Sequence, residues 1–191
     1  MDFLLLGNHP FLDFINTKPV VGGETLELIE DGGGFFNLIG RLDLTERPVV
    51  RRPVEREAQE IASLAREIRE DFRALLFANR DSKLDASELV QANQWFARLG
   101  SPQVNLRDGE PSLLYRPFEA EPLAPELRAL IESGLELFTS DSFSKVRKCA
   151  NPGCVLWYLD TTKSRTRRWC SMNMCGNVEK ARAFRQRHKT E

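Results

Sequence analysis

The stretch Cys149-Ala-Asn-Pro-Gly-Cys154-Val-Leu-Trp-Tyr-Leu-Asp160, followed by Arg167-Arg-Trp-Cys170-Ser-Met-Asn-Met-Cys175, contains all four cysteines of this 191-residue chain. The cysteines form two pairs with four residues inside each pair and 15 residues between the pairs. Four thiolates fill a tetrahedral zinc shell and leave no position for water. The turn-forming residues 151–153 let the backbone fold sharply within the first pair. The spacing therefore predicts one structural Zn²⁺ bound by Cys149, Cys154, Cys170 and Cys175.

Three other uses of these cysteines remain open at this point. Two disulfides would suit a secreted protein, but the start of the sequence lacks the features of a signal peptide. Redox-active cysteines usually occur as a tighter C-x-x-C motif on a βαβ unit. Iron–sulfur clusters are also bound by four thiolates, although with different spacings. Zinc is the preferred interpretation.

The residues around the cysteines indicate the local fold. Residues 155–159 favour a strand, and a polar turn leads to a return at Arg168-Trp169, so the order is knuckle, hairpin, knuckle, helix. A unit of this size has little core of its own, and zinc binding worth roughly 10–16 kcal/mol would fold it. Trp157, Tyr158 and Trp169 are expected to form its small core, although aromatic residues can also stack on bases.

Charge is distributed unevenly along the chain, although the formal net charge is only −1. Residues 141–191 contain 12 Lys or Arg and 4 acidic residues, which gives +8, whereas residues 1–140 carry −9. This asymmetry indicates that the C-terminal segment binds a polyanion. The alternative is that the acidic body neutralises the segment by folding against it. The sequence has no apolar run long enough to span a membrane, and we expect a cytoplasmic location.

The first 140 residues have the pattern of a mostly helical domain. Pro10 fits the first turn of a short helix ending near Thr17, and Gly32-Gly33-Gly34 indicates a break before a helix at 35–39. Apolar residues at helical spacing predict a long helix over 54–80 with a solvated Glu/Arg face; they are Ala58, Ile61, Leu64, Ile68, Phe72, Leu75 and Leu76.

The remaining elements of this domain are shorter. We expect a strand at Phe3–Leu6, a turn at Gly7-Asn8, a turn between Pro48 and Pro53, and a helix starting at Asp85 with Glu88 in its capping box. A β-hairpin is predicted around 107–111, and a further helix over 125–138. The fold class is therefore α+β: a mostly helical domain with a small hairpin at 1–140, and a small treble-clef or ribbon-like zinc finger at 141–191.

His9, Asp13 and Asn16 form a polar stripe on the otherwise apolar first helix. Such a stripe can line a pocket for a small-molecule effector. Local capping and hydrogen bonding to nearby backbone is the preferred alternative. No motif for a nucleophile, a phosphate loop or a catalytic metal is present, so we do not expect an enzyme.

Basic residues concentrate in two places of the C-terminal segment, the polar turn and the last helix. Asn177 is expected to cap that helix, and Ala181, Phe184 and His188 share a face that is expected to pack on the finger. The candidate nucleic-acid contacts are Lys163, Arg165, Arg167, Arg168, Lys180, Arg182, Arg185, Arg187 and Lys189.

Two segments resemble known families. Cys149-x4-Cys154-x3-Tyr158-x-Asp160-x-Thr162-Lys163, Arg167-Arg168-Trp169-Cys170 and Cys175-Gly176-Asn177 resemble the CGNR zinc finger, and the segment 7–17 resembles the start of the ABATE domain. The resemblance implies zinc at the four cysteines and a role as a bacterial stress-linked transcription regulator. The sequence departs from the pattern at Val178, where the family has Arg, and at Ser164, where Asn is more usual.

Three functions are compatible with these features. The first is a transcription regulator whose finger binds DNA and whose N-terminal domain binds an effector or a partner. The second is an RNA- or ribosome-binding factor that uses the same basic surface. The third is an adaptor whose finger contacts an acidic protein.

Overall fold

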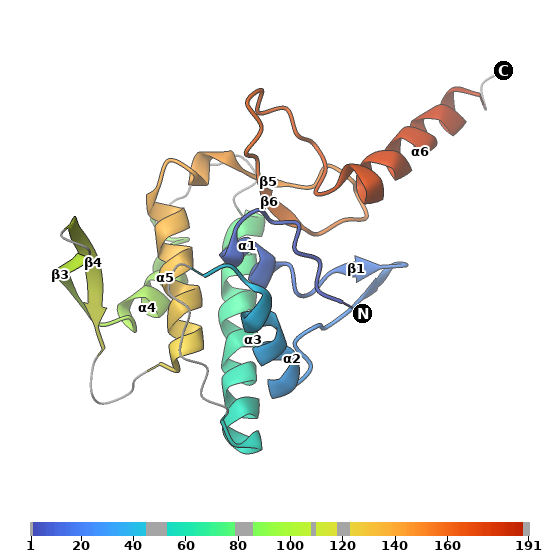
Figure 1. Ribbon diagram of the computed structural model, residues 1–191. Helices are drawn as coiled ribbons and strands as arrows, with labels where there is room; N and C mark the ends of the chain where they lie inside the picture. Colours follow the sequence, from blue (N-terminus) through green and yellow to red (C-terminus); the bar gives the residue numbers. More distant parts are fainter. Residues whose placement is uncertain (1, 45–52, 79–85, 108–109, 118–122, 189–191) are drawn as a thin grey trace.

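The structure is a computed structural model that describes residues 2–44, 53–78, 86–107, 110–117 and 123–188 (Figure 1). Its α-helices are α1 (Pro10–Ile15), α2 (Gly32–Arg41), α3 (Glu55–Ala78), α4 (Val90–Ala97), α5 (Pro125–Thr139) and α6 (Asn177–Arg187). Its strands are β1 (Val20–Val21), β2 (Glu24–Thr25), β3 (Ser101–Arg107), β4 (Glu110–Arg116), β5 (Val146–Lys148) and β6 (Trp157–Leu159). The strands form three antiparallel pairs, β1–β2, β3–β4 and β5–β6. The α+β class is confirmed.

Helix α3 is the central element, with α1, α2, α4 and α5 packed around it (Figure 1). The sequence predicted this helix, and Ile68, Phe72 and Leu76 are buried on its apolar face as expected. The predicted helices at 10–17, 35–39 and 125–138 and the hairpin around 107–111 are also confirmed. Among the residues that the structure describes, no helix has both the length and the apolar character needed to cross a bilayer.

An aromatic cluster joins α1, α3 and α5. The rings of Phe11 and Phe72 meet edge to face with centroids 4.8 Å apart, and Phe138 contacts both. Gly134 of α5 lies directly beneath Phe11, and a Cβ atom at this position would come within 2.7 Å of the ring. Glycine is therefore needed for α1 to approach α5 this closely.

Two expectations for the N-terminal half are wrong. Residues 3–6 form an irregular segment and not a strand. The triple glycine is not a break but the first turn of α2, which Asp31 caps by accepting a hydrogen bond from the Gly34 amide at 2.8 Å. A Cβ atom on Gly32 would lie 2.5 Å from the Cβ of Ala58, so glycine here allows α2 to contact α3.

Two further expectations fall partly outside the described residues. Pro48 lies there, as does Asp85, the residue expected to begin a helix. The described helix α4 begins at Val90 and follows a turn that contains Glu88, so its start was predicted too early.

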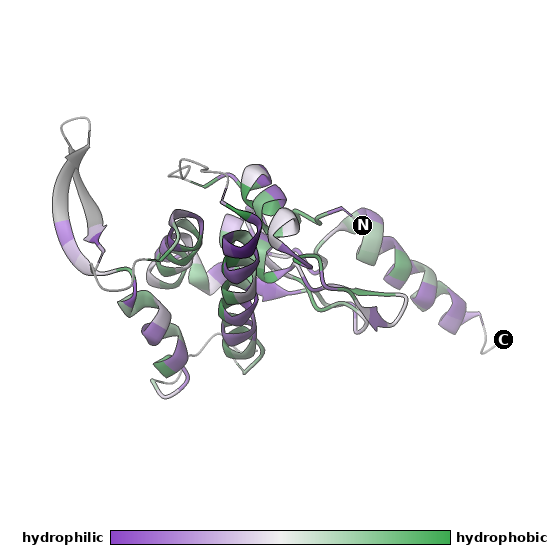
Figure 2. Cartoon of the chain, turned by 90° about the horizontal axis from the view of Figure 1, so that it is seen from below, coloured by the Kyte–Doolittle hydropathy of each residue, from purple (hydrophilic) through white to green (hydrophobic). Residues whose placement is uncertain are grey.

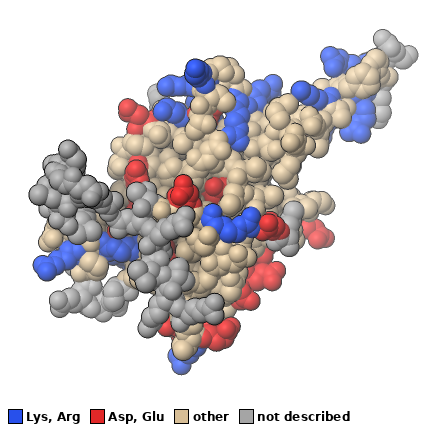
Figure 3. All heavy atoms as spheres, viewed as in Figure 1, with Lys and Arg blue, Asp and Glu red and all other residues tan. Residues whose placement is uncertain are grey.

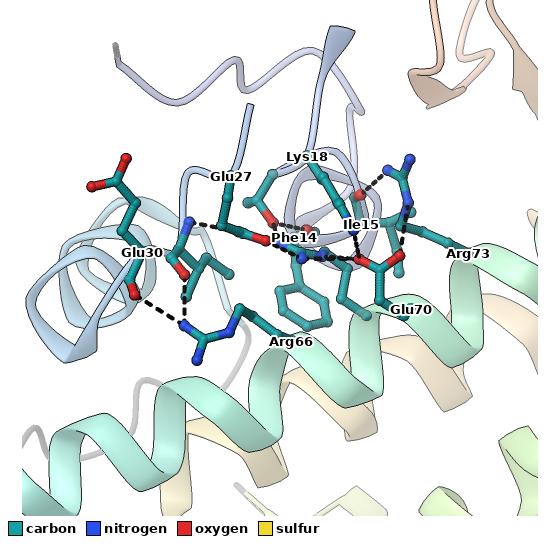
Figure 4. A network of polar contacts seen from close by, with 11 residues as sticks. Phe14, Ile15, Lys18, Glu27, Glu30, Arg66, Glu70 and Arg73 are labelled. Carbon is teal, nitrogen blue, oxygen red and sulfur yellow. Dashed lines mark hydrogen bonds and ion pairs between the residues drawn. The ribbon is translucent and has the colours of Figure 1, made fainter. Parts of the chain in front are cut away.

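The Glu/Arg face of α3 is not wholly solvated, which corrects a third expectation. Arg69 is only 1% exposed, and its guanidinium binds the Glu27 carboxylate in a bidentate arrangement and the Thr17 hydroxyl at 3.0 Å. Arg73 donates to the carbonyl of Ile15 at the end of α1, and Arg66 donates to the carbonyls of Ile29 and Glu30 (Figure 4). These arginines tie the segment between α1 and α2 to α3. Periodicity did not predict this, because the sequence does not reveal whether an Arg side chain binds water or a group of the protein.

We expect Glu27→Leu to lower the free energy of unfolding by about 2–4 kcal/mol, because it removes the bidentate partner of the buried Arg69 and leaves only the more exposed Glu70 to pair with it. Chemical denaturation measures this loss. Glu60→Leu is the matched control: Glu60 pairs with Arg56 at the surface, and its loss should change stability by less than about 1 kcal/mol. Equal losses in the two variants would contradict the structural role of the Arg69–Glu27 pair.

Candidate zinc centre and basic surface

The first cysteine pair lies in the tight connection between β5 and β6. Cys149 donates its amide to the carbonyl of Leu156 at 2.9 Å, which extends the β5–β6 pairing. Asn151 closes the turn: its carbonyl accepts from the Cys154 amide and its side chain from the Gly153 amide, both at 2.9 Å. The predicted sharp turn is therefore present. The predicted hairpin partner was wrong, since β6 pairs with β5 and not with Arg168-Trp169.

The second pair spans a single helical turn that leads into α6. Residues Met172–Gly176 form a π-helical turn capped by Ser171, whose side chain accepts from the Met174 amide. Helix α6 follows Gly176 without a side-chain cap of its own, so the expectation that Asn177 caps the helix is wrong. A Cβ atom on Gly176 would come within 2.5 Å of the Met172 sulfur, so a larger residue here would have to displace the Met172 side chain.

The two pairs converge on one point. The four Sγ atoms lie within 4.8 Å of one another, with Cys154–Cys170 at 3.8 Å and Cys170–Cys175 at 3.6 Å. Zn–S bonds of about 2.3 Å in a tetrahedron place sulfurs about 3.8 Å apart, so the spacing fits zinc. All four cysteines are free thiols that are at most 9% exposed, which excludes the disulfide alternative. Cys149, Cys154, Cys170 and Cys175 form a site for one structural zinc.

Crowding of the sulfurs makes their ionisation unequal. Hydrogen bonds from the thiols of Cys154 and Cys170 lower the pKa of Cys149 to about 2. The same contact with Cys149 raises the pKa of Cys154 to about 12, and the pKa of Cys170 is raised as well. Four neighbouring thiolates repel one another, whereas a divalent cation at their centre stabilises all four.

A cation–π contact and a carboxylate brace the turn between the cysteine pairs. The guanidinium of Arg167 lies 4.2 Å from the ring centroid of Tyr158 and donates to the carbonyls of Leu6, Trp169 and Cys170. The Tyr158 hydroxyl donates to the carbonyl of Arg167 at 2.6 Å. The Asp160 carboxylate is 2% exposed and accepts from Thr162 and from the Arg167 amide. The guanidinium of Arg167, a candidate nucleic-acid contact, is therefore used within the fold.

The polar stripe of α1 is occupied by backbone contacts. His9 Nδ1 accepts from the Phe11 amide, and Asp13 accepts from the Gly7 amide at 2.7 Å, as the capping alternative predicted. Burial raises the pKa of Asp13 to about 6 in spite of that hydrogen bond. Asn16 differs: its side chain donates to the Trp157 carbonyl and accepts from the Trp157 amide, both at 2.8 Å. These contacts argue against an effector pocket at His9, Asp13 and Asn16.

Further contacts join the N-terminal segment to β6. The Leu159 amide donates to the Gly7 carbonyl at 2.8 Å, and the side chain of Asn8 donates to the Leu159 carbonyl at 3.2 Å. Leu4 and Leu6 pack against the cysteine cluster. Trp157 belongs to the main core, where it meets Phe77 edge to face, while Tyr158 and Trp169 pack around the cysteines. The small core expected within the finger is thus divided between two clusters. The division of the chain at residues 140 and 141 stays a prediction.

The basic residues gather on the finger and along α6, away from the acidic part of the body (Figure 3). Lys163, Arg165 and Arg168 are exposed on the turn, and α6 has no buried residue. The expectation that Phe184 packs on the finger is wrong, because this side chain is 57% exposed. Figure 2 shows hydrophobic and hydrophilic residues side by side along α6 as it extends from the rest of the chain. Lys189 lies outside the described residues.

Comparison with known families agrees with this geometry. Residues 8–141 match the ABATE family, whose description is "Putative stress-induced transcription regulator". The chain belongs to the ABATE family. Residues 145–188 of this ABATE protein match the CGNR zinc finger, so the two families occur in the order that the sequence indicated. No curated protein matches the chain.

We expect the purified ABATE protein to contain one zinc per chain, and Cys170→Ser to lose it, because a closed four-thiolate site tolerates no missing ligand. Elemental analysis of protein purified without added metal measures the ratio. Ser164→Ala, in the exposed turn between the pairs, is the control and should keep one zinc. Wild-type protein without bound metal would contradict the assignment.

We expect Asn16→Ala to lower the free energy of unfolding by about 2–4 kcal/mol, because it leaves the buried amide and carbonyl of Trp157 without partners. The variant should also release zinc to a chelator faster than the wild type. Asn93→Ala is the matched control, since Asn93 is exposed on α4. Denaturation and chelator-release measurements that do not distinguish the two variants would show that the contact is dispensable.

Proposed function

We propose that this protein is a transcription regulator that binds duplex DNA through the exposed cations of the finger turn and α6. One observation carries the proposal: the segment that the zinc site organises has a strongly basic surface, whereas the body of the protein is acidic. Opposite charge on the two parts directs the polyanion to one end of the molecule, because the body repels it. The family description as a transcription regulator supports the same function.

The proposed contacts are fewer than the cations of the C-terminal segment. Arg167 is left out, because its guanidinium binds backbone carbonyls. The cations that remain are Lys163, Arg165, Arg168, Lys180, Arg182, Arg185, Arg187 and Lys189. If about six of them contact phosphates, the logarithm of the binding constant should fall with the logarithm of salt concentration at a slope of about −5.

The remainder of the protein supports a regulatory and not a catalytic role. A zinc ion with four protein thiolates has no open position for a substrate, so its role is structural. For the body we propose a partner- or effector-binding role, but at a site other than His9, Asp13 and Asn16. The described surface grooves lie along the outer side of α3, where charged side chains such as Arg56, Glu60 and Arg66 line them.

Fluorescence anisotropy with a labelled duplex DNA and a folded RNA of equal length tests the proposal at two salt concentrations. We expect the duplex to bind more tightly, with a slope of about −5, and chelator treatment to abolish binding. Arg182→Ala with Arg185→Ala should reduce the slope by about 2. Arg56→Ala with Arg116→Ala removes the same charge from exposed positions on the body and should leave binding unchanged.

A preference for RNA would contradict the proposal and favour an RNA- or ribosome-binding factor. Absence of binding to either nucleic acid would also contradict it and favour an adaptor for an acidic protein.

A further inference from the structure

Exposed apolar side chains are concentrated at the start and along the length of α6. Of the large hydrophobic residues that are exposed among the described part of the chain, four lie within residues 172–184. They are Met172, Met174, Val178 and Phe184, at 48%, 42%, 54% and 57% exposure. A basic helix needs no such residues for phosphate contacts, because cations alone provide them. The apolar residues therefore indicate a second kind of contact.

One stripe of α6 combines an amide with apolar side chains. Asn177, Ala181, Phe184 and His188 follow one another at steps of three and four residues, so they share one side of the helix. All four are exposed, and Phe184 and His188 contact each other with ring centroids 4.3 Å apart. We call these four residues the central stripe.

Cations border the central stripe on both sides. At about 100° per residue, Lys180 and Arg187 lie roughly 80° to one side of its centre, and Arg182 and Arg185 lie roughly 100° to the other side. Two rows of cations with an uncharged stripe between them match a groove that has a phosphate backbone on each wall and bases at its floor. A single strand offers one phosphate row, and pairing of α6 with α6 of a second copy would bring like charges together.

The dimensions select the major groove. It is about 12 Å wide and admits an α-helix, whereas the minor groove is about 6 Å wide and does not. The distance along the helix from Asn177 to Phe184 is about 10 Å, at about 1.5 Å per residue. This length corresponds to about three base pairs, at about 3.4 Å each.

The side chains of the central stripe have the chemistry that recognises adenine and thymine. The Asn side chain can form one bidentate contact with adenine, in which its NH2 group donates to N7 and its carbonyl oxygen accepts from the N6 amino group. Apolar side chains such as Ala and Phe contact the thymine methyl group. Guanine is read most often by Arg or Lys, and these residues lie on the borders of the stripe. We propose that the central stripe of α6 recognises an A·T-rich segment of about three base pairs in the major groove. This inference rests on the proposed binding of duplex DNA.

The thymine methyl group provides a direct test, because it lies in the major groove and deoxyuridine lacks it. The test uses three duplexes of 16 base pairs that differ only in the central hexamer. In the first the hexamer is alternating A·T, in the second deoxyuridine replaces each thymidine of that hexamer, and in the third the hexamer is alternating G·C. With zinc-loaded full-length protein, we expect the A·T duplex to bind about tenfold more tightly than the G·C duplex. The deoxyuridine duplex should lose about threefold or more of the affinity.

Phe184→Ala separates base contacts from phosphate contacts. We expect it to remove the deoxyuridine effect and most of the A·T preference while the salt slope stays unchanged, because every phosphate-binding cation remains. Asn177→Ala should lower the A·T preference but keep the deoxyuridine effect. Val54→Ala is the matched control, since Val54 is an apolar residue of the body that is 71% exposed. Retained zinc and an unchanged circular dichroism spectrum establish that the variants fold.

Equal affinity for the three duplexes, with a salt slope of about −5, would overturn the proposed role of the central stripe in base recognition. The proposed function would remain in place. An A·T preference that survives in Phe184→Ala would overturn the role in base recognition too. Failure to bind any duplex would instead remove the proposed function itself.

Discussion

The side chain of Asn16 forms two hydrogen bonds with the backbone of Trp157, and the arrangement of the whole protein depends on them. They join the last turn of α1 to β6, the strand that follows the first cysteine pair. Because both groups of Trp157 are buried, no water can replace the amide side chain. The indole of Trp157 enters the main core beside Phe77, while the next residue, Tyr158, faces the cysteines. Successive side chains of β6 thus point to opposite sides, one into the core of the helical body and the next toward the zinc centre.

This connection explains why a small zinc module is attached to a helical domain so firmly. A four-cysteine unit of about 40 residues has little apolar core, and metal binding supplies much of its folding free energy. Here β6 also gains contacts from α1, Gly7 and Asn8, so the metal and the body stabilise the same strand. The result is a rigid base for α6, which has no buried residue of its own and extends toward solvent with its cations and its exposed Phe184.

Much of this could be predicted from the sequence, and many of the exceptions share one physical cause. Period and spacing revealed α1, α3, α5, the β3–β4 hairpin and the cysteine cluster, because each depends on residues close together in sequence. Several of the errors concern long-range partners, whereas the wrong strand at 3–6 and the wrong cap at Asn177 are local. The bond from Asn16 to Trp157 spans 141 residues, and the pair Arg69–Glu27 spans 42. Gly32 was interpreted as part of a break, whereas it and Gly134 each allow two helices to approach closely. Which groups face each other across such distances is decided by packing, which no local pattern encodes.

Hydrogen exchange with and without zinc tests most directly whether the metal centre and the body form one cooperative structure. If β6 connects them as described, removing zinc should lower the protection of amides in α1 and in the segment 155–160 together. Loss of protection in the finger alone, with α1 and the surrounding core unchanged, would contradict it.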